Sequence, residues 1–200
     1  MDSLTTTDAV NQPTTATDSS DRPKLRFATT WFGGCSGCHM SFLDLDEWLF
    51  ELAKYADVVY SPVGSDAKVF PENVDICLAE GAITNEENLE FIKKVRSRSK
   101  LLVSFGDCAV NGNVTAMRNP CATVDQILDR CYVQLADHSP QLPYEPGIVP
   151  PLLKYALPIH QVVPIDVFIP GCPPSSAEIQ AALEELFTGK HDDNYHAKFG

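Results

Sequence analysis

The spacing of apolar residues constrains the fold of this 200-residue chain more than any other feature. Five short runs are nearly continuous in apolar character and rich in β-branched and aromatic residues, which is typical of strands covered on both faces. They are Leu25 to Trp31, Val58 to Tyr60, Val74 to Ala79, Leu101 to Phe105 and Asp166 to Ile169. The stretches between them show helical spacing of apolar residues. Strands and helices therefore alternate, which predicts a parallel sheet between two helix layers.

Sequence signals also mark where helices begin. In a capping box, Ser or Thr and an acidic or amide residue three positions later satisfy free backbone donors of the first turn. Four such pairs occur: Ser41 with Asp44, Thr84 with Glu87, Thr123 with Gln126, and Ser175 with Glu178. We expect an α/β fold of three layers, a flavodoxin-like parallel sheet with helices on both faces.

Composition divides the chain into a tail and a folded part. Residues 1–23 hold six Thr, three Ser and four Asp and no aromatic residue. Such a segment cannot bury enough apolar surface to offset its ordering entropy. We therefore predict a disordered N-terminal tail over residues 1–23 and a single domain over residues 24–200.

The overall charge argues against several classes of partner. The 27 acidic and 15 basic side chains give a net charge of -12, which repels nucleic-acid phosphates and anionic membrane surfaces. No run approaches the ~18 consecutive apolar residues of a membrane span, and a secretory signal is missing. We expect a cytoplasmic protein that binds no nucleic acid and has no membrane span.

Residues 139–164 interrupt the alternation of strands and helices. They contain seven of the fifteen prolines together with several large aliphatic residues. Proline disfavours regular helix and central strand, while the apolar content argues against a solvated linker. Two interpretations stay open: an irregular cover over the domain's own core, or a surface that faces a partner protein.

Four of the seven cysteines directly follow predicted strands. Cys35 and Cys38 come after the first strand, Cys108 follows the fourth in Gly-Asp-Cys, and Cys172 follows the fifth in Pro-Gly-Cys-Pro-Pro. The carboxyl ends of parallel strands share one edge of a sheet, so these distant residues are expected to meet there. Four thiolates from glycine-rich loops match a [4Fe-4S] cluster. The alternative is a structural zinc site, but zinc usually takes two local Cys-x-x-Cys pairs.

Other residues near this edge carry weaker signals. Cys77, inside the third strand, is expected to be a small buried hydrophobe, and Cys121 and Cys131 to be structural or free thiols. Glu80 ends the third strand, where a carboxylate could relay protons, orient a ligand, or accept hydrogen bonds from backbone amides. His39 could modulate a cluster or could simply begin a helix.

Taken together, the motifs resemble those of [NiFe] hydrogenase small subunits over residues 24–200. They are Cys-x-x-Cys after the first strand, Ala-Glu-Gly-Ala after the third, Gly-Asp-Cys after the fourth and Pro-Gly-Cys-Pro-Pro after the last. The runs Gly-Cys-Ser-Gly-Cys-His-Met-Ser and Gly-Ile-Val-Pro-Pro-Leu-Leu look closest to the small (delta) subunits of cytoplasmic NAD-reducing hydrogenases. The resemblance implies a flavodoxin-like domain that holds the proximal [4Fe-4S] cluster through Cys35, Cys38, Cys108 and Cys172.

The resemblance also implies a role and partners. A separate large subunit would carry the nickel-iron centre that splits H2, and this chain would relay electrons from it through one cluster. The twin-arginine signal and the cysteine- and histidine-rich extension of exported relatives are missing here. The implied acceptor is therefore a diaphorase module with flavin and iron-sulfur clusters. The expected activity is hydrogen:NAD+ oxidoreductase, in which this chain alone is not catalytic.

Three alternatives remain open. Some members are proposed to bind an extra FMN, but the Cys35 to Cys38 turn takes the place of the flavodoxin phosphate loop, and the loop from Ser61 to Asp66 lacks a nucleotide fingerprint. The cluster-bearing quinone reductase subunit of complex I is similar but has two adjacent cysteines in its first loop. A noncatalytic module that binds zinc or flavin is the alternative from another class.

Overall fold

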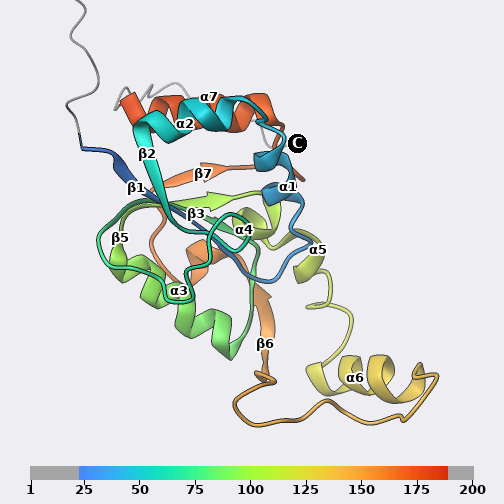
Figure 1. The fold of residues 1–200 in the computed structure, drawn as a ribbon. Helices are drawn as coiled ribbons and strands as arrows, with labels where there is room; N and C mark the ends of the chain where they lie inside the picture. The colour runs from blue at the N-terminus through green and yellow to red at the C-terminus, as the bar shows by residue number, and fades with distance from the viewer. Residues whose placement is uncertain (1–22, 189–200) are drawn as a thin grey trace, which may run out of the picture.

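A parallel five-stranded sheet forms the centre of the molecule (Figure 1). The computed structural model describes residues 23–188, so the predicted tail lies outside them except for Pro23. The strands are β1 (Leu25–Trp31), β2 (Ala56–Tyr60), β3 (Val74–Glu80), β5 (Ser99–Phe105) and β7 (Val167–Ile169). Their order is β2-β1-β3-β5-β7, the order of flavodoxin-like sheets. The predicted strands and fold class are confirmed, with small shifts at the strand ends.

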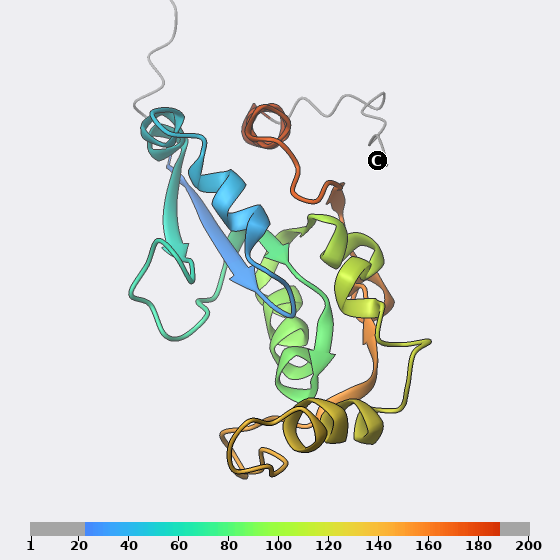
Figure 2. The same ribbon diagram turned by 90° about the vertical axis from the view of Figure 1, so that its right-hand side faces the viewer.

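Helices cover both faces of this sheet, as Figures 1 and 2 show. The helices α1 (Gly37–Leu43), α2 (Trp48–Tyr55) and α7 (Ser176–Thr188) pack on one face, and α3 (Glu86–Arg98) and α4 (Asp107–Asn111) on the other. Successive strand residues point to opposite faces, so Phe27 lies in the core under α7 and Ala28 in the core under α3. The three-layer prediction is confirmed.

A second, smaller unit extends from the sheet, as Figure 1 shows. It includes a two-stranded antiparallel sheet of β4 (Ile83–Asn85) and β6 (Leu152–Leu157), two strands that were not predicted. The other elements of this region are α5 (Asn113–Ala116), α6 (Val124–Asp129) and the π-helix η2 (Arg130–Gln134). The 3-10 helix η3 (Ile159–Gln161) returns to the main core, where Ile159 is buried.

The proline-rich segment divides into two parts. Residues 139–149 are exposed throughout, whereas Ala156, Ile159 and Val163 are buried. The later part therefore covers the core, as one of the two interpretations predicted. Part of this segment is strand β6, which pairs with the short strand β4 and lies outside the central sheet. Prolines next to β6 therefore interrupt no central strand.

Two of the four predicted capping boxes are present. Thr123 and Gln126 exchange both bonds at the start of α6, at 3.0 and 3.4 Å. Ser175 and Glu178 do the same before α7, at 2.9 and 3.3 Å. These residues satisfy amides of the first helical turn that have no partner within the helix.

The other two predicted helix starts are wrong. Ser41 lies inside α1, which begins at Gly37 after Ser36, a residue in the left-handed region with φ 63°. At α3 the cap is Asn85, whose side chain accepts the amide of Asn88 at 2.7 Å. Asn is as good a cap as Thr and stands one position closer to the helix, so it takes the role predicted for Thr84.

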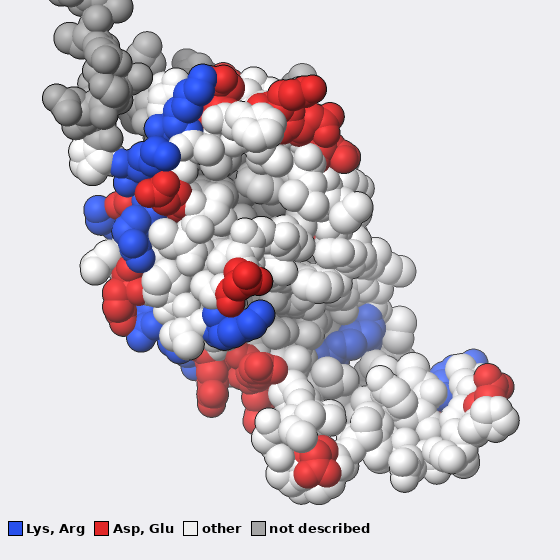
Figure 3. Space-filling model, in the orientation of Figure 1, with Lys and Arg blue, Asp and Glu red and all other residues white. Residues whose placement is uncertain are grey.

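Charged side chains are unevenly spread over the face drawn in Figure 3, with basic and acidic groups gathered along one edge and acidic groups near α2 and α7. A broad region between them is nearly free of charge in this view. Within residues 23–188, none of the helices is both long and apolar enough to cross a membrane.

Candidate functional site

The register of the sheet aligns the ends of four strands. Trp31 pairs with Glu80, Glu80 with Phe105, and Phe105 with Ile169, so these residues form one row at the carboxyl edge. The chain turns into the loop of Cys35 and Cys38 after Trp31, into Cys108 after Phe105, and into Cys172 after Ile169. All four predicted cysteines therefore lie at one edge, as expected from the parallel topology.

The first loop leaves β1 along the neighbouring strand β3. The amide of Phe32 donates to the carbonyl of Glu80 at 2.8 Å, and Gly33 and Ala82 exchange backbone bonds at 2.9 and 2.7 Å. The chain then turns at Ser36 and enters α1. This path leaves Cys35 exposed and buries Cys38 on the first turn of α1.

Gly106 lets the second loop pass under Cys38. Its φ of +80° lies in the region that favours glycine, and a Cβ atom built on it would lie 2.1 Å from Cys38 Sγ. The next residues enter α4, where Cys108 is buried. Any side chain at position 106 would therefore displace a candidate ligand.

Asp107 links the second loop to the third. Its carboxylate accepts the amide of Gly171 at 2.7 Å, while its own amide donates to the Gly171 carbonyl at 2.9 Å. This reciprocal pair holds the loop of Cys108 against the loop of Cys172. This role of Asp107 was not predicted, although a polar residue directly before a strand-end cysteine was a usable signal.

Ser41 links the first loop to the third. Its buried hydroxyl donates to the carbonyl of Pro174 at 2.6 Å, so the face of α1 that follows Cys38 is tied to the chain just after Cys172. This bond replaces the capping role predicted for Ser41. Together, Ser41 and Asp107 connect the three loops that carry the cysteines.

The thiols at this edge affect one another electrostatically. Burial raises the pKa of Cys38 well above its ordinary value, and Glu80, Cys108, Cys35 and Cys172 raise it further. Burial also raises the pKa of Cys108, with Cys35 and Cys172 as the next causes. Each thiolate would therefore repel the others, and only a strongly positive group could hold all four in the ionised form.

Across the part of the chain that the structure describes, no three His, Cys, Asp or Glu side chains are arranged to hold one metal ion. A site for one zinc ion would need four sulfurs at about 2.3 Å from a common centre. An iron-sulfur cluster is a larger group, and its ligands bind different iron atoms.

Glu80 and His39 form a buried pair beside the cysteines, with exposed fractions of 2% and 1%. Glu80 Oε2 accepts the backbone amide of His39 at 3.0 Å and also contacts its ring Nδ1. Ser36 makes no side-chain bond to the helix, so this carboxyl from β3 satisfies an amide of the first turn of α1. The hydrogen bond predicted as one alternative for Glu80 is thus present.

The other three cysteines differ from these four. Cys77 is fully buried in β3, as predicted, and burial raises the pKa of its thiol to about 12. Cys121 and Cys131 are exposed.

The loop after β2, which the sequence offered as a weak candidate for a nucleotide site, is bonded to itself. The backbone amides of Val63 and Gly64 donate to the Ser61 hydroxyl at 3.3 and 3.2 Å. These two amides are therefore turned toward their own loop.

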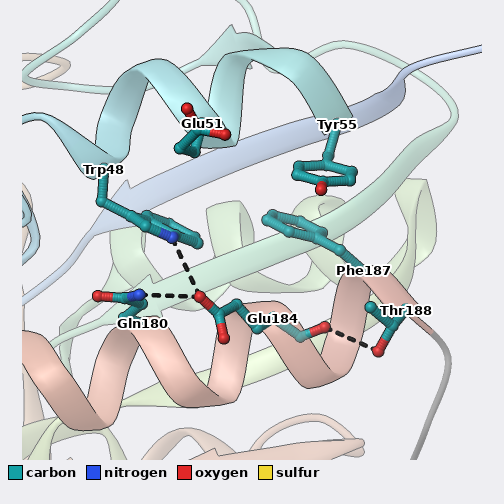
Figure 4. Close-up of a pocket in the computed structure, with 7 residues that line it drawn as sticks. All are labelled: Trp48, Glu51, Tyr55, Gln180, Glu184, Phe187 and Thr188. Atoms are coloured by element: carbon teal, nitrogen blue, oxygen red, sulfur yellow. Dashed lines mark hydrogen bonds between the residues drawn. The ribbon is translucent and has the colours of Figure 1, made fainter. Parts of the chain in front are cut away.

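A separate groove of about 410 Å³ lies between α2 and α7, shown in Figure 4. Trp48 donates its indole N–H to Glu184 at 3.1 Å, and the rings of Tyr55 and Phe187 stack with centroids 6.2 Å apart. Glu51, Gln180 and Thr188 complete the lining. The groove contains none of the predicted site residues and was not foreseen from the sequence.

Comparison with known proteins assigns the family. The family described as NADH ubiquinone oxidoreductase, 20 Kd subunit, matches residues 35–186, which include all four candidate cysteines. The chain belongs to this family. The chain is also 38% identical over 174 residues to the delta subunit of the NAD-reducing hydrogenase HoxS of Cupriavidus necator, and the match covers 85% of this chain and 82% of that subunit.

Structural similarity points the same way. A chain from the crystal structure of an NAD+-reducing [NiFe]-hydrogenase in the H2-reduced state superposes with a TM-score of 0.81 and 36% sequence identity. The match covers 88% of this chain and 98% of that chain. The resemblance to the small (delta) subunits of NAD-reducing hydrogenases is confirmed, and the hydrogenase subunits are better supported relatives than those of complex I.

Other relatives of the chain are longer. An F420-non-reducing hydrogenase subunit of Methanothermobacter thermautotrophicus is 36% identical, and the match covers 84% of this chain but 54% of that protein. The iron-sulfur subunit of the same type of enzyme from Archaeoglobus profundus is 28% identical, with 56% of its length matched. The chain thus spans about half the length of these curated relatives.

Proposed function

We propose that this chain is the electron-transfer small subunit of an NAD-reducing [NiFe] hydrogenase and that it holds one [4Fe-4S] cluster. The observation that carries the proposal is the meeting of Cys35, Cys38, Cys108 and Cys172 at one sheet edge, on three loops tied together by Ser41 and Asp107. The family and the match to a chain of an NAD+-reducing [NiFe]-hydrogenase support the same assignment.

The residues at this edge fit a cluster in three respects. Four thiols are the ligand set of [4Fe-4S] clusters. Gly106 provides room beneath Cys38 that no other residue would leave. The repulsion that raises the pKa of Cys38 and Cys108 would be relieved by an iron-bearing group, because metal binding favours the thiolate form.

The chemistry supplied by the bound group is one-electron transfer. The chain's own residues hold and position it. Cys38 and Cys108 would bind from the buried side and Cys35 and Cys172 from the exposed side. Asp107 fixes the distance between the Cys108 and Cys172 loops, and Ser41 fixes α1 against the Cys172 loop. Because two of the four cysteines are exposed, a cluster held by them would lie near the surface, where electrons could pass to and from partner subunits.

The implied partners are a large subunit that carries the nickel-iron centre and a diaphorase module that contains flavin and iron-sulfur clusters. The support is the source of the matched chain, an NAD+-reducing [NiFe]-hydrogenase. The overall reaction would be oxidation of H2 with reduction of NAD+, in the cytoplasm. We assign no FMN to this chain, because the turn that flavodoxin-like proteins use for phosphate carries Cys35 and Cys38.

The test is H2-dependent NAD+ reduction by the complex purified anaerobically with its co-expressed partners. We expect Cys108→Ala to abolish the activity and to reduce the iron content. Cys121→Ala, which removes an exposed thiol outside the site, should leave both unchanged. Equal activity of the two variants would refute the cluster role of Cys108. Quinone reduction without any response to H2 would instead support the complex I alternative.

A further inference from the structure

A chain of buried polar side chains leads away from the candidate cluster site. It starts at Glu80 and continues through His39 and Thr29 to Ser61, and none of the four is more than 4% exposed. His39 Nε2 lies 3.0 Å from Thr29 Oγ1, and the Thr29 hydroxyl donates to Ser61 Oγ at 2.9 Å. This row of hydrogen-bonded side chains thus connects the end of β3, the start of α1, strand β1 and the loop after β2.

Thr29 can bond to both of its neighbours at once. Its hydroxyl donates to Ser61, which leaves its oxygen free to accept from His39 Nε2. On the other side of the ring, His39 Nδ1 contacts Glu80 Oε2, the atom that also accepts the backbone amide of His39 at 3.0 Å.

Hydrogen bonding explains how the Glu80 carboxyl can lie buried beside the cysteines. An isolated buried carboxylate would be very unfavourable, whereas one that is paired and fully hydrogen-bonded is tolerated. Glu80 is the largest electrostatic influence on Cys38 after burial and also acts on Cys108. The orientation of the pair therefore matters to the thiols that surround it.

We propose that Thr29 is a positioning residue for the cluster and acts through His39 and Glu80. Its oxygen fixes the His39 ring, the ring fixes the Glu80 carboxyl, and that carboxyl holds the amide of His39 on the first turn of α1 beside Cys38. This network determines the electrostatic surroundings of the cluster and the position of the Cys38 sulfur. The proposal rests on the proposed function, because it assumes a cluster at this site.

The test compares isosteric variants in the anaerobically purified complex. Thr29→Val removes the acceptor for His39, and Thr29→Ser keeps an acceptor there. Ser61→Ala removes the side chain to which Thr29 donates. Thr30→Val is the matched control: Thr30 is adjacent on β1 and equally buried, but faces the other side of the sheet. The readouts are iron and sulfide content, the EPR line shape of the reduced cluster, and its midpoint potential.

We expect Thr29→Val to shift the midpoint potential and the EPR line shape, Ser61→Ala to shift them less, and Thr29→Ser and Thr30→Val to match the wild type. Loss of iron in Thr29→Val but not in Thr30→Val would also support the network. Identical spectra and potentials for Thr29→Val, Ser61→Ala and Thr30→Val would overturn it. A wild-type complex without any iron-sulfur signal would instead refute the proposed function itself.

Discussion

Gly106 lies directly beneath the sulfur of Cys38, so close that a Cβ atom at position 106 would be 2.1 Å from Sγ. This contact joins the loop after β5 to the first turn of α1, which are far apart in the sequence. The Cys38 sulfur fills the space above position 106, so this position has no room for a side chain.

Gly106→Ala should strongly reduce the cluster content of the complex. The methyl group would displace Cys38 Sγ, and the backbone conformation with φ 80° and ψ 161° would add about 1–3 kcal/mol of strain for any residue other than glycine. Gly147→Ala is the matched control, since it has a φ of +81° and nothing within 4 Å of the new Cβ. Iron analysis should show a large loss for the first variant and none for the second.

Asp107→Ala should loosen the link between the Cys108 and Cys172 loops. The Gly171 amide would lose a charge-assisted bond of 2.7 Å, which is typically worth about 1.5–3 kcal/mol. We expect faster loss of iron to a chelator. Asp107→Asn keeps an acceptor oxygen and should lie between Asp107→Ala and the wild type; a wild-type rate for Asp107→Ala would contradict the role given to Asp107.

Ser41→Ala tests the bond that joins α1 to the Cys172 loop. Losing the donor to the Pro174 carbonyl should cost about 1 kcal/mol and leave that buried carbonyl with one partner fewer. The expected result is a lower temperature of cluster loss. Ser97→Ala, which removes an exposed bond of 2.9 Å to Lys94 on α3, should have no measurable effect. Equal effects from both would indicate general destabilisation.

The three cysteines outside the site should differ in reactivity. In the folded chain, iodoacetamide should modify Cys121 and Cys131 where partner subunits do not cover them, and should modify Cys77 only after unfolding. Cys77 is fully buried with a pKa raised to about 12, so it lacks both access and thiolate. Peptide mass spectrometry after labelling at pH 8 is the measurement. Rapid labelling of Cys77 before unfolding would contradict its placement in the core.

The raised pKa of Cys77 also makes the stability of the fold depend on pH. Burial raises the pKa of Cys77 from 9.0 to about 12, so the folded chain keeps a proton that the unfolded chain releases. Its contribution to stability is therefore complete below about pH 9 and is lost as the pH rises toward 12. Cys77→Ala should make the loss of stability between pH 9 and 11 less steep, as measured by thermal unfolding. An unchanged slope would contradict this.

Much of the fold was predictable because its signals are local. Apolar runs gave the five strands, and the alternation with helices gave the parallel topology, which alone brings Cys35, Cys108 and Cys172 to one edge. The β4 and β6 pair escaped prediction because β4 has three residues and β6 lies among prolines. Such short strands depend on partners that only the folded chain provides.

The links between the loops could not be predicted, because they depend on tertiary contacts. Ser41 matched a capping pattern, but its hydroxyl bonds to Pro174, far along the chain. Glu80 and His39 were noted singly, and nothing in their spacing indicated that they pair or that Thr29 joins them. A pattern of residue types identifies candidate ligands, whereas the bonds that position them appear only with the fold.

The most direct test of the central claim is iron and sulfide analysis with low-temperature EPR of the complex after anaerobic purification and reduction. The cluster assignment predicts iron and sulfide in the ratio of one [4Fe-4S] cluster at this site, with its EPR signal lost in Cys108→Ala and kept in Cys121→Ala. Zinc at this site in place of iron, or a cluster signal that survives Cys108→Ala unchanged, would contradict it.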